Sequence, residues 1–407
     1  MAAEFSSTID QALHDKRIAG GAAIAIDKSG RELIRKEFGK TSTNPSDAKP
    51  FAFDTTLWYA SSTKLLTSIC ALHCVEQGLL KLDDDIATVL PEWKDPQIIT
   101  GYADDGSPIL VKAEQKITLR RLLTHSSGMV YPEMNPSITQ YQAAKSKELG
   151  YDVAKEERIS EYFMNPLIFE PGSSWVYGPS IDWAGRMVEV VTGSKLGEFM
   201  AKHIFEPLGM RYSTFDPVGN EEVMSRMTGR VGRNAETGLV GEETSGLRQV
   251  RKKEDHHGGS GMYSCANDYI KVLTSLLLDD GKLLPSGGAM MQELFAGQLE
   301  SPSGLHFWAT HPMFGAFLTP GYPRDPETTE WNHSLGGAIV AKEIPGHASK
   351  GTLFWSGLPN NYWFVDREAG VAGCYASWIL PPGDAPTGEM FGALQRAAFW
   401  EAKGGVL

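Results

Sequence analysis

The stretch Ala60-Ser61-Ser62-Thr63-Lys64-Leu65-Leu66-Thr67 (ASSTKLLT) places a serine three residues before a lysine, at the start of a long apolar run. The run predicts a helix over 65–78, because Gly78 is a residue type that often ends helices. Residues i and i+3 share one face of a helix. We therefore expect Ser61 and Lys64 to point the same way, with Ser61 near the positive end of the helix dipole.

A serine hydroxyl is a weak nucleophile until a base takes its proton. Lys64 can be that base when its amine is neutral, and burial or a nearby cation favours this state. The neighbours that can supply the burial are Leu57, Trp58, Leu65 and Leu66. The S-x-x-K pattern has only two fixed positions, however, and a chain of 407 residues often contains one by chance. Other segments must therefore support the assignment.

A second segment, Trp175-Val176-Tyr177-Gly178-Pro179-Ser180, comes just before a predicted helix over 180–192. A tyrosine held near a lysine can share proton transfer with it, which makes Tyr177 a candidate catalytic residue. The alternative is that Tyr177 is an ordinary half-buried aromatic residue before a helix that Ser180 caps.

A third segment, Phe354-Trp355-Ser356-Gly357-Leu358, ends a predicted strand near the C-terminus. Gly357 allows the backbone to approach a ligand closely. The backbone N–H of Leu358, together with that of Ser61, can form an oxyanion hole. The alternative is a plain strand end followed by a turn.

Strand-like runs gather at both ends of the chain, and helix-like runs fill its middle. The expected strands are 21–27 and 33–38, joined as a hairpin, and 335–341, 351–355, 361–366 and 371–378. The expected helices are 5–16, 65–78, 117–123, 180–192, 195–204, 268–278 and 390–402. We therefore predict an α/β (α+β) fold, with an antiparallel sheet flanked by helices and built from 1–95 and 262–407. A mainly helical domain is inserted at 96–261, with a long irregular cover segment in its last part.

Composition limits the class of protein. A chain of 407 residues exceeds the usual size of one core, so we expect two lobes. The net charge of -12 argues against nucleic-acid and anionic-membrane partners. We find no signal-type apolar region at the N-terminus and no run long enough to span a membrane. The cysteines form neither a disulfide framework nor a metal-type pair, so we expect a reducing, cytoplasmic setting. They are Cys70, Cys74, Cys265 and Cys374. The serine mechanism needs no metal or bound cofactor, so we expect none.

In their order and spacing, the three segments resemble the serine β-lactamase-like, penicillin-binding family. Its hallmarks are S-x-x-K, then Y-x-N, then a K-T-G-like triplet on a C-terminal strand. The stretches 78–84 (GLLKLDD) and 122–128 (LLTHSSG) are typical of class C-like members, and 175–189 (WVYGPSIDWAGRMVE) is similar to the transesterase or esterase branch. The resemblance covers nearly the whole chain, from about residue 18 to the end.

This resemblance implies a role for each candidate residue. Ser61 is the nucleophile, Lys64 the general base and Tyr177 its partner in proton transfer. The N–H groups of Ser61 and Leu358 stabilise the oxyanion. The site is expected in a cleft between the two lobes.

Two departures from the family pattern concern the substrate. Pro179 stands where Y-x-N has its asparagine, and it has no amide to offer a substrate. Trp355 stands where K-T-G has its lysine, and it offers an apolar face instead of a positive charge. Both changes argue against β-lactam and D-Ala-D-Ala substrates. They favour an uncharged ester or thioester with an apolar acyl group.

Aromatic residues near the motifs are candidates for a pocket wall, although burial in the core is the alternative for most of them. They are Trp58, Tyr59, Tyr131, Trp175, Trp331, Trp355 and Trp363. As substrate-binding residues we predict Trp355, Gly357, Tyr131 and Trp363.

The lysine mechanism needs no histidine, so His125 is expected to be a structural loop residue and His347 to have no catalytic role. His256 and His257 lie in a polar segment and are expected to be solvated, or to recognise the phosphopantetheine of an acyl carrier. Asp83-Asp84-Asp85 is better explained by helix capping than by metal binding.

The expected function is that of a serine acyltransferase, which moves an acyl group from an ester or thioester to a hydroxyl of a small secondary metabolite. An acyl-CoA or an acyl-carrier protein is a possible thioester donor. The alternative is a carboxylesterase or thioesterase with the same site, in which water is the acceptor. A β-lactamase and a non-catalytic binding homologue rank below both, because the first conflicts with Pro179 and Trp355 and the second would lack a nucleophile, base or tyrosine.

Overall fold

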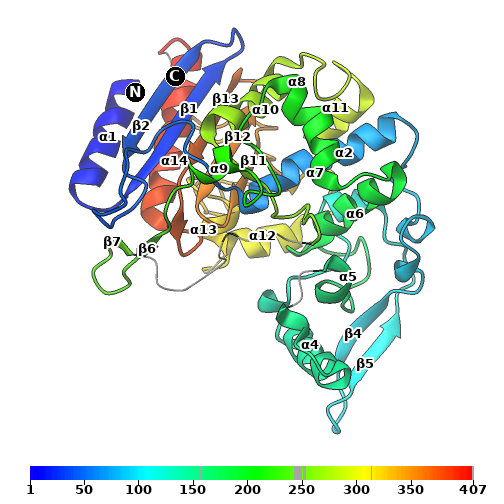
Figure 1. Ribbon diagram of the computed structural model, residues 1–407. Helices are drawn as coiled ribbons and strands as arrows, with labels where there is room; N and C mark the ends of the chain where they lie inside the picture. Colours follow the sequence, from blue (N-terminus) through cyan, green and yellow to red (C-terminus); the bar gives the residue numbers. More distant parts are fainter. Residues whose placement is uncertain (156–157, 243–249, 251–253, 313, 406–407) are drawn as a thin grey trace.

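A seven-stranded antiparallel sheet of order β2-β1-β13-β12-β11-β10-β9 forms the centre of the protein (Figure 1). The computed structural model describes residues 1–155, 158–242, 250, 254–312 and 314–405. The strands are β1 Gly20–Asp27, β2 Glu32–Gly39, β9 Trp331–His333, β10 Ala338–Val340, β11 Leu353–Gly357, β12 Asn361–Asp366 and β13 Val371–Ala376. Because Ile24 of β1 lies opposite Cys374 of β13, the two ends of the chain share one sheet. The predicted fold class is confirmed.

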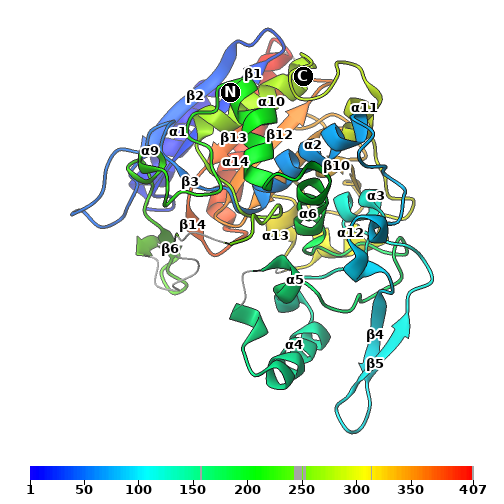
Figure 2. The ribbon, with the colours of Figure 1, turned by 45° about the vertical axis from the view of Figure 1, so that its right-hand side comes forward.

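Helices cover both faces of this sheet, as the alternation of side chains along β12 shows. Tyr362 and Phe364 contact Phe391 of helix α14 (Ala385–Ala402). Trp363, which lies between them, contacts Tyr269 of helix α10 (Ala266–Leu278). Successive residues of a strand point to opposite faces, so α14 and α10 lie on opposite sides. Helix α1 (Ala2–His14) packs against α14, which brings the two termini together (Figures 1 and 2).

The predicted hairpin of β1 and β2 is confirmed. Its turn is closed by the Asp27 carboxylate, which accepts hydrogen bonds from the hydroxyl and N–H of Ser29 and from Arg31. These bonds, the Ser29 hydroxyl first, lower the pKa of Asp27 to about 2. Gly30 follows with φ +80°, a conformation that favours glycine.

Helix α2 (Thr63–Glu76) lies against helix α6 (Ser180–Thr192) beside the sheet. Helices α4 (Pro136–Leu149) and α5 (Ile159–Tyr162) lie away from the sheet, with the hairpin of β4 and β5 (Figures 1 and 2). Other elements of the region 96–261 are β4 Gln97–Tyr102, β5 Pro108–Lys112, α3 Leu119–Leu123, α7 Leu196–Met200, the π-helical turn Ala201–Phe205, α8 Glu206–Leu208 and α9 Glu221–Met224. The proposed domain boundaries at 95 and 261 stay a prediction.

The expected cover segment at 216–260 contains more order than its composition predicts. Strands β6 (Val231–Arg233) and β7 (Val240–Glu242) pair within it, and β6 also pairs in parallel with β14 (Ile379–Leu380). Its residues 243–249 and 251–253 lie outside the described part of the chain. The remaining elements are β3 Leu57–Trp58 paired with β8 Tyr263–Ser264, and helices α11 Ala289–Phe295, α12 Ser303–Thr310 and α13 Gly315–Leu318.

The four cysteines are buried free thiols, as the sequence predicts. Burial raises the pKa of Cys74 to about 11 and that of Cys374 to about 12, so neither is poised to react as a thiolate. Across the described residues, no helix combines the length and the apolar character that a membrane crossing requires.

Candidate active site

Ser61 lies in a short 3₁₀ turn, Ala60–Ser62, that leads directly into α2. Ala60 has a φ of +45°, which is costly for a residue with a side chain and needs support from its surroundings. Ser62 supplies it, because its hydroxyl donates to Asn361 Oδ1 (2.7 Å) and its carbonyl accepts from Tyr269 Oη (2.8 Å). The turn therefore presents Ser61 at the N-terminus of α2, where the helix dipole favours developing negative charge.

Three side chains meet at Ser61 Oγ. Lys64 Nζ lies 3.3 Å from it, and Tyr177 Oη donates to it at 2.5 Å. Lys64 and Tyr177 also touch, since the amine lies 4.7 Å from the centre of the tyrosine ring. The structure thus brings together the serine, lysine and tyrosine that the sequence singled out, although 116 positions separate Ser61 from Tyr177.

Lys64 is buried and held by two further contacts. Its amine donates to the carbonyl of Gly259 (2.7 Å) and to Tyr131 Oη (3.3 Å). When the amine is neutral, it has two N–H groups for these two acceptors and one lone pair. The lone pair is then left for the Ser61 proton, which is the arrangement that a general base needs.

Tyr177 is placed by the close packing of its loop. A Cβ at Gly178 would lie 2.1 Å from the Met129 carbonyl, so only glycine permits this approach. The backbone N–H of Val176 donates to the carbonyl of His125. These contacts fix the tyrosine against Tyr131, whose ring centre lies 5.3 Å away.

The end of β11 reaches Ser61 from the opposite side. A Cβ at Gly357 would lie 2.4 Å from the Tyr59 carbonyl and 2.3 Å from Asn361 Oδ1. Gly357 therefore allows one backbone to approach another, rather than a ligand as expected. This approach places Leu358 beside Ser61, and both residues line the same cavity. The proposed oxyanion hole stays a prediction.

A predominantly apolar cavity of about 580 Å³ opens above Ser61. Its volume suits a small-molecule ligand. Of the residues singled out from the sequence, it is lined by Trp58, Ser61, Tyr131, Tyr177 and Leu358. No sequence pattern pointed to the other lining residues, which are Ala60, Glu133, Met134, Tyr162, Phe163, Ser260, Phe314, Phe317, Leu318, Pro381 and Pro382.

Trp355 and Trp363 are placed differently from the expectation. Both are buried, and neither is among the described residues that line the cavity. Trp355 lies beneath the site, with its ring 5.5 Å from that of Tyr177. Trp363 lies opposite Trp355 on the same face of the sheet and packs against Tyr269 of α10, whose hydroxyl donates to the Ser62 carbonyl. Their predicted contact with substrate is corrected to a packing role.

His125 and His333 form a buried pair beneath Tyr177, 5.6 Å apart. His125 is a structural loop residue with a φ of +55°. Burial, with the charges of His333 and Lys64, lowers the pKa of His125 well below its usual value. Burial lowers the pKa of His333 to about 4. Both rings are therefore neutral at physiological pH.

The expectation that His256 and His257 are solvated is wrong. His257 is buried, with Nδ1 3.7 Å from Asp182 Oδ1. His256 accepts a hydrogen bond from the N–H of Gly197 and stacks on Phe215. Both residues help to pack the segment before β8 against α6 and α7.

The Asp83-Asp84-Asp85 run serves local structure. Asp85 accepts from the N–H of Ala87 and caps the turn Ile86–Thr88, as predicted. Asp83 forms a two-point ion pair with Arg120. Within the described residues, no three histidine, cysteine or acidic side chains gather as metal ligands would.

A buried amide, Asn360, joins the turn after β11 to the cavity wall. Its Nδ2 donates to the carbonyls of Ile379 and Pro381, and its Oδ1 accepts from the N–H of Asp384. Asn360 follows Leu358 by two residues, so it couples the turn at the expected oxyanion site to the loop that carries Pro381.

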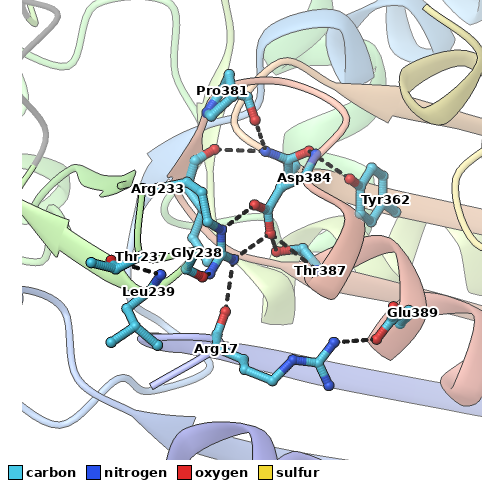
Figure 3. A network of polar contacts seen from close by, with 12 residues as sticks. Arg17, Arg233, Thr237, Gly238, Leu239, Tyr362, Pro381, Asp384, Thr387 and Glu389 are labelled. Carbon is cyan, nitrogen blue, oxygen red and sulfur yellow. Dashed lines mark hydrogen bonds and ion pairs between the residues drawn. The ribbon is translucent and has the colours of Figure 1, made fainter. Parts of the chain in front are cut away.

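An ion pair between β6 and Asp384 anchors the loop that carries Pro381 (Figure 3). The guanidinium of Arg233, on β6, makes two bonds of 2.7 Å to the Asp384 carboxylate and a third to the carbonyl of Arg17. Asp384 also caps α14 through Thr387. The cover segment is thereby fixed to the first turn of α14.

Comparison with known sequences shows the family to which this chain belongs. The sequence profile described as Beta-lactamase matches residues 5–397. The chain belongs to the beta-lactamase family. Lovastatin esterase of Penicillium rubens is 35% identical over 93% of this chain and 93% of its own. Monacolin J acid methylbutanoyltransferase of Aspergillus terreus is 31% identical over 92% of this chain and 90% of its own.

Comparison with solved structures agrees. Unliganded simvastatin synthase (LovD) from Aspergillus terreus matches with a TM-score of 0.89 at 28% identity, over 98% of both chains. The resemblance to the transesterase or esterase branch of the beta-lactamase family is confirmed, and the chain is an enzyme of the serine hydrolase and acyltransferase type.

Proposed function

We propose that this chain is a serine acyltransferase that carries the acyl group on Ser61 between donor and acceptor. The observation that carries the proposal is the position of Ser61 Oγ. It is within reach of a buried amine (3.3 Å) and of a tyrosine hydroxyl (2.5 Å), on the floor of an apolar cavity of about 580 Å³. A hydroxyl so placed can be deprotonated and acylated away from bulk water.

In the first half-reaction, neutral Lys64 takes the Ser61 proton as Oγ forms a bond to the carbonyl carbon of the donor. The carbonyl π electrons move to oxygen, and the N–H groups of Ser61 and Leu358 stabilise the oxyanion. When the carbonyl re-forms, the C–O or C–S bond of the donor breaks. The leaving group takes up the proton from Lys64, directly or through Tyr177, and the acyl-enzyme remains.

The second half-reaction is the reverse with a new nucleophile. An acceptor hydroxyl gives its proton to Lys64 through the same contacts and attacks the acyl carbon. Ser61 then leaves and recovers a proton. The cycle neither gains nor loses protons or electrons, and its residues are Ser61, Lys64, Tyr177 and the N–H of Leu358.

The substrate class follows from the cavity and from the relatives. Apolar side chains dominate the lining, which supports an acyl group without charge. Because one relative is named for methylbutanoyl transfer to monacolin J acid, we propose a small polyketide alcohol as acceptor. An acyl-CoA or acyl-carrier thioester is the proposed donor. A cytoplasmic location belongs to the same proposal, since the four buried cysteines are free thiols.

Hydrolysis is the second candidate, because the relative with 35% identity is named an esterase. The same acyl-enzyme serves both reactions, and water simply replaces the acceptor alcohol. A β-lactamase activity ranks below both, since Pro179 has no side-chain amide and Trp355 is buried.

The test is the intact mass of the protein after mixing with p-nitrophenyl butyrate, for wild type and Ser61→Ala. We expect an adduct of one butyryl group on wild type and none on Ser61→Ala. Added alcohols should then speed the loss of the adduct and yield the alcohol ester if transfer is the function. Loss at an unchanged rate would favour the esterase. Release of p-nitrophenol by Ser61→Ala at the wild-type rate would refute the assignment.

A further inference from the structure

A glycine-rich turn, residues 257–261, lies against the segment that carries the nucleophile. Three successive carbonyls of this turn accept hydrogen bonds from side chains of that segment. Thr67 Oγ1 donates to Gly258 (2.8 Å), Lys64 Nζ to Gly259 (2.7 Å) and Trp58 Nε1 to Ser260 (2.5 Å). The position of the Lys64 amine is therefore set by a backbone carbonyl, whose direction depends on how the turn is held.

Asp182 holds the turn from the other side. It lies in the first turn of α6, five residues after Tyr177, and is 1% exposed. Its Oδ1 accepts the N–H of Gly259 at 3.0 Å. The Gly259 N–H and the Gly258 carbonyl, which accepts from Thr67, belong to the same peptide group. The next carbonyl along the chain, that of Gly259, accepts from Lys64.

The second carboxylate oxygen of Asp182, Oδ2, also lies close to Gly259. A Cβ at Gly259 would lie 2.4 Å from Asp182 Oδ2. Gly259 is not among the glycines with positive φ, and the three atoms nearest to the added Cβ all belong to the Asp182 carboxylate. Among the described residues, Oδ2 has no hydrogen-bond partner. A buried carboxylate with an unsatisfied oxygen is costly, and it calls for a reason beyond packing.

We propose that Asp182 is a positioning residue for the general base. It fixes the peptide of Gly259, and the Gly259 carbonyl then holds the Lys64 amine with its lone pair toward Ser61. The proposal rests on the proposed function, because it assigns Lys64 the role of base. The N-terminal end of α6 then positions both the tyrosine and the base, since Tyr177 precedes the helix and Asp182 lies in its first turn.

The test measures the maximal rate of Ser61 acylation by p-nitrophenyl butyrate separately from the half-saturating concentration. We expect Asp182→Ala to lower the maximal rate about 30-fold, because small misplacements of a catalytic group have effects of this size. The half-saturating concentration should stay unchanged, since Asp182 does not line the cavity. Asp182→Asn keeps an acceptor for the Gly259 N–H and should recover most of the rate.

A double-mutant cycle isolates the contact. Gly259→Ala should lower the rate by itself, but should add little in the Asp182→Ala background, where the carboxylate that excludes the methyl group is gone. Gly288→Ala is the matched control. Its Cβ would meet the Pro285 carbonyl at 2.8 Å, outside α6 and the turn 257–261, so its effect should add to that of Asp182→Ala.

The outcomes separate the two proposals. If wild type forms the Ser61 adduct but Asp182→Ala acylates at the wild-type rate, the positioning role is refuted and the proposed function stands. Equal losses in Asp182→Ala and Asp182→Asn, or additive losses with Gly259→Ala, also refute it. If Asp182→Ala does not fold, Gly259→Ala still decides, because it strains the same contact with the carboxylate in place. Absence of any adduct on wild type refutes the proposed function and the role with it.

Discussion

Ser61 lies between two regions that are held in different ways. We call them the base side, formed by Lys64, Asp182 and the turn 257–261, and the oxyanion side, formed by the turn 357–361 and the loop 379–384. On the base side, three successive backbone carbonyls accept hydrogen bonds from Thr67, from the buried Lys64 amine and from Trp58. On the oxyanion side, an amide and an ion pair tie the loop to a distant strand.

This difference predicts which property, the acylation rate or the free energy of unfolding, a substitution on each side changes first. A backbone carbonyl has no charge to leave unpaired, so damage on the base side should appear first in the rate. A buried ion pair leaves an uncompensated charge when one partner is removed. Damage at the outer end of the oxyanion side should therefore appear first in the free energy of unfolding.

The largest effect is expected on the base side, from Lys64→Met. Loss of the general base should slow acylation of Ser61 about 1000-fold, within the usual range for such groups. Burst kinetics with p-nitrophenyl butyrate measures this rate. Lys112→Met is the control, because Lys112 is an exposed lysine whose partner is Asp95. A Lys64→Met enzyme that acylates within tenfold of wild type would exclude Lys64 as the base.

The outer end of the oxyanion side is tested by Arg233→Met. Asp384 is 2% exposed, so its carboxylate would be left buried without its cation. We expect a loss of about 3 kcal/mol in the free energy of unfolding. Urea titration measures it, and the acylation rate of the folded enzyme should change less than threefold.

The double variant Arg233→Met with Asp384→Asn sharpens this result. The amide can still cap α14 and carries no charge, so part of the lost stability should return. If the double variant is less stable than Arg233→Met alone, the unpaired charge is not the cause.

The inner end of the oxyanion side is tested by Gly357→Ala. The added methyl would press on the Tyr59 carbonyl and on Asn361 Oδ1, and so move the turn that carries Leu358 away from Ser61. We expect acylation to slow about 30-fold. Gly241→Ala is the control, because its methyl would meet nothing within 4 Å. A wild-type rate for Gly357→Ala would show that this approach does not position the oxyanion donor.

The two sides also differ in how far the sequence predicted them. Ser61 and Lys64 are three residues apart on one helix, so local geometry was enough to pair them. The Gly259 carbonyl lies 195 positions from Lys64 and has no residue type to mark it, because every residue has a carbonyl. Asp182 was missed for the same reason, since its partner is a backbone N–H.

Two further features of the structure were not predicted from the sequence. Trp363 was expected in the pocket. It shares a sheet face with Trp355, but it is buried there against Tyr269 of α10, a tertiary contact that composition does not reveal. Helix α4 is not among the helices expected from the sequence, and a proline stands at its start. Asn135 caps this helix and Pro136 occupies its first position, where proline is favoured.

The smallest effect concerns the pH dependence of stability, through two buried histidines. Burial lowers the pKa of His333, beneath Tyr177, and of His347, which is hydrogen-bonded to Gln395 of α14, to about 4 in each case. The unfolded chain, with a histidine pKa near 6.5, therefore binds more protons than the folded protein between pH 6.5 and 4. Stability should fall as pH falls through this window, and each histidine contributes at most about 3 kcal/mol.

His347→Gln separates the two contributions. Its side-chain amide can donate to Gln395 but does not titrate, so the variant should lose about 3 kcal/mol less than wild type between pH 7 and pH 4. Urea titrations at pH 7, 6, 5 and 4 measure the difference, and His333→Gln reports the contribution of His333 in the same way. Parallel stability curves for wild type and His347→Gln would mean that His347 is protonated in the folded protein as readily as in the unfolded chain. The imidazole would then reach solvent in the folded protein, which its burial against Gln395 of α14 argues against.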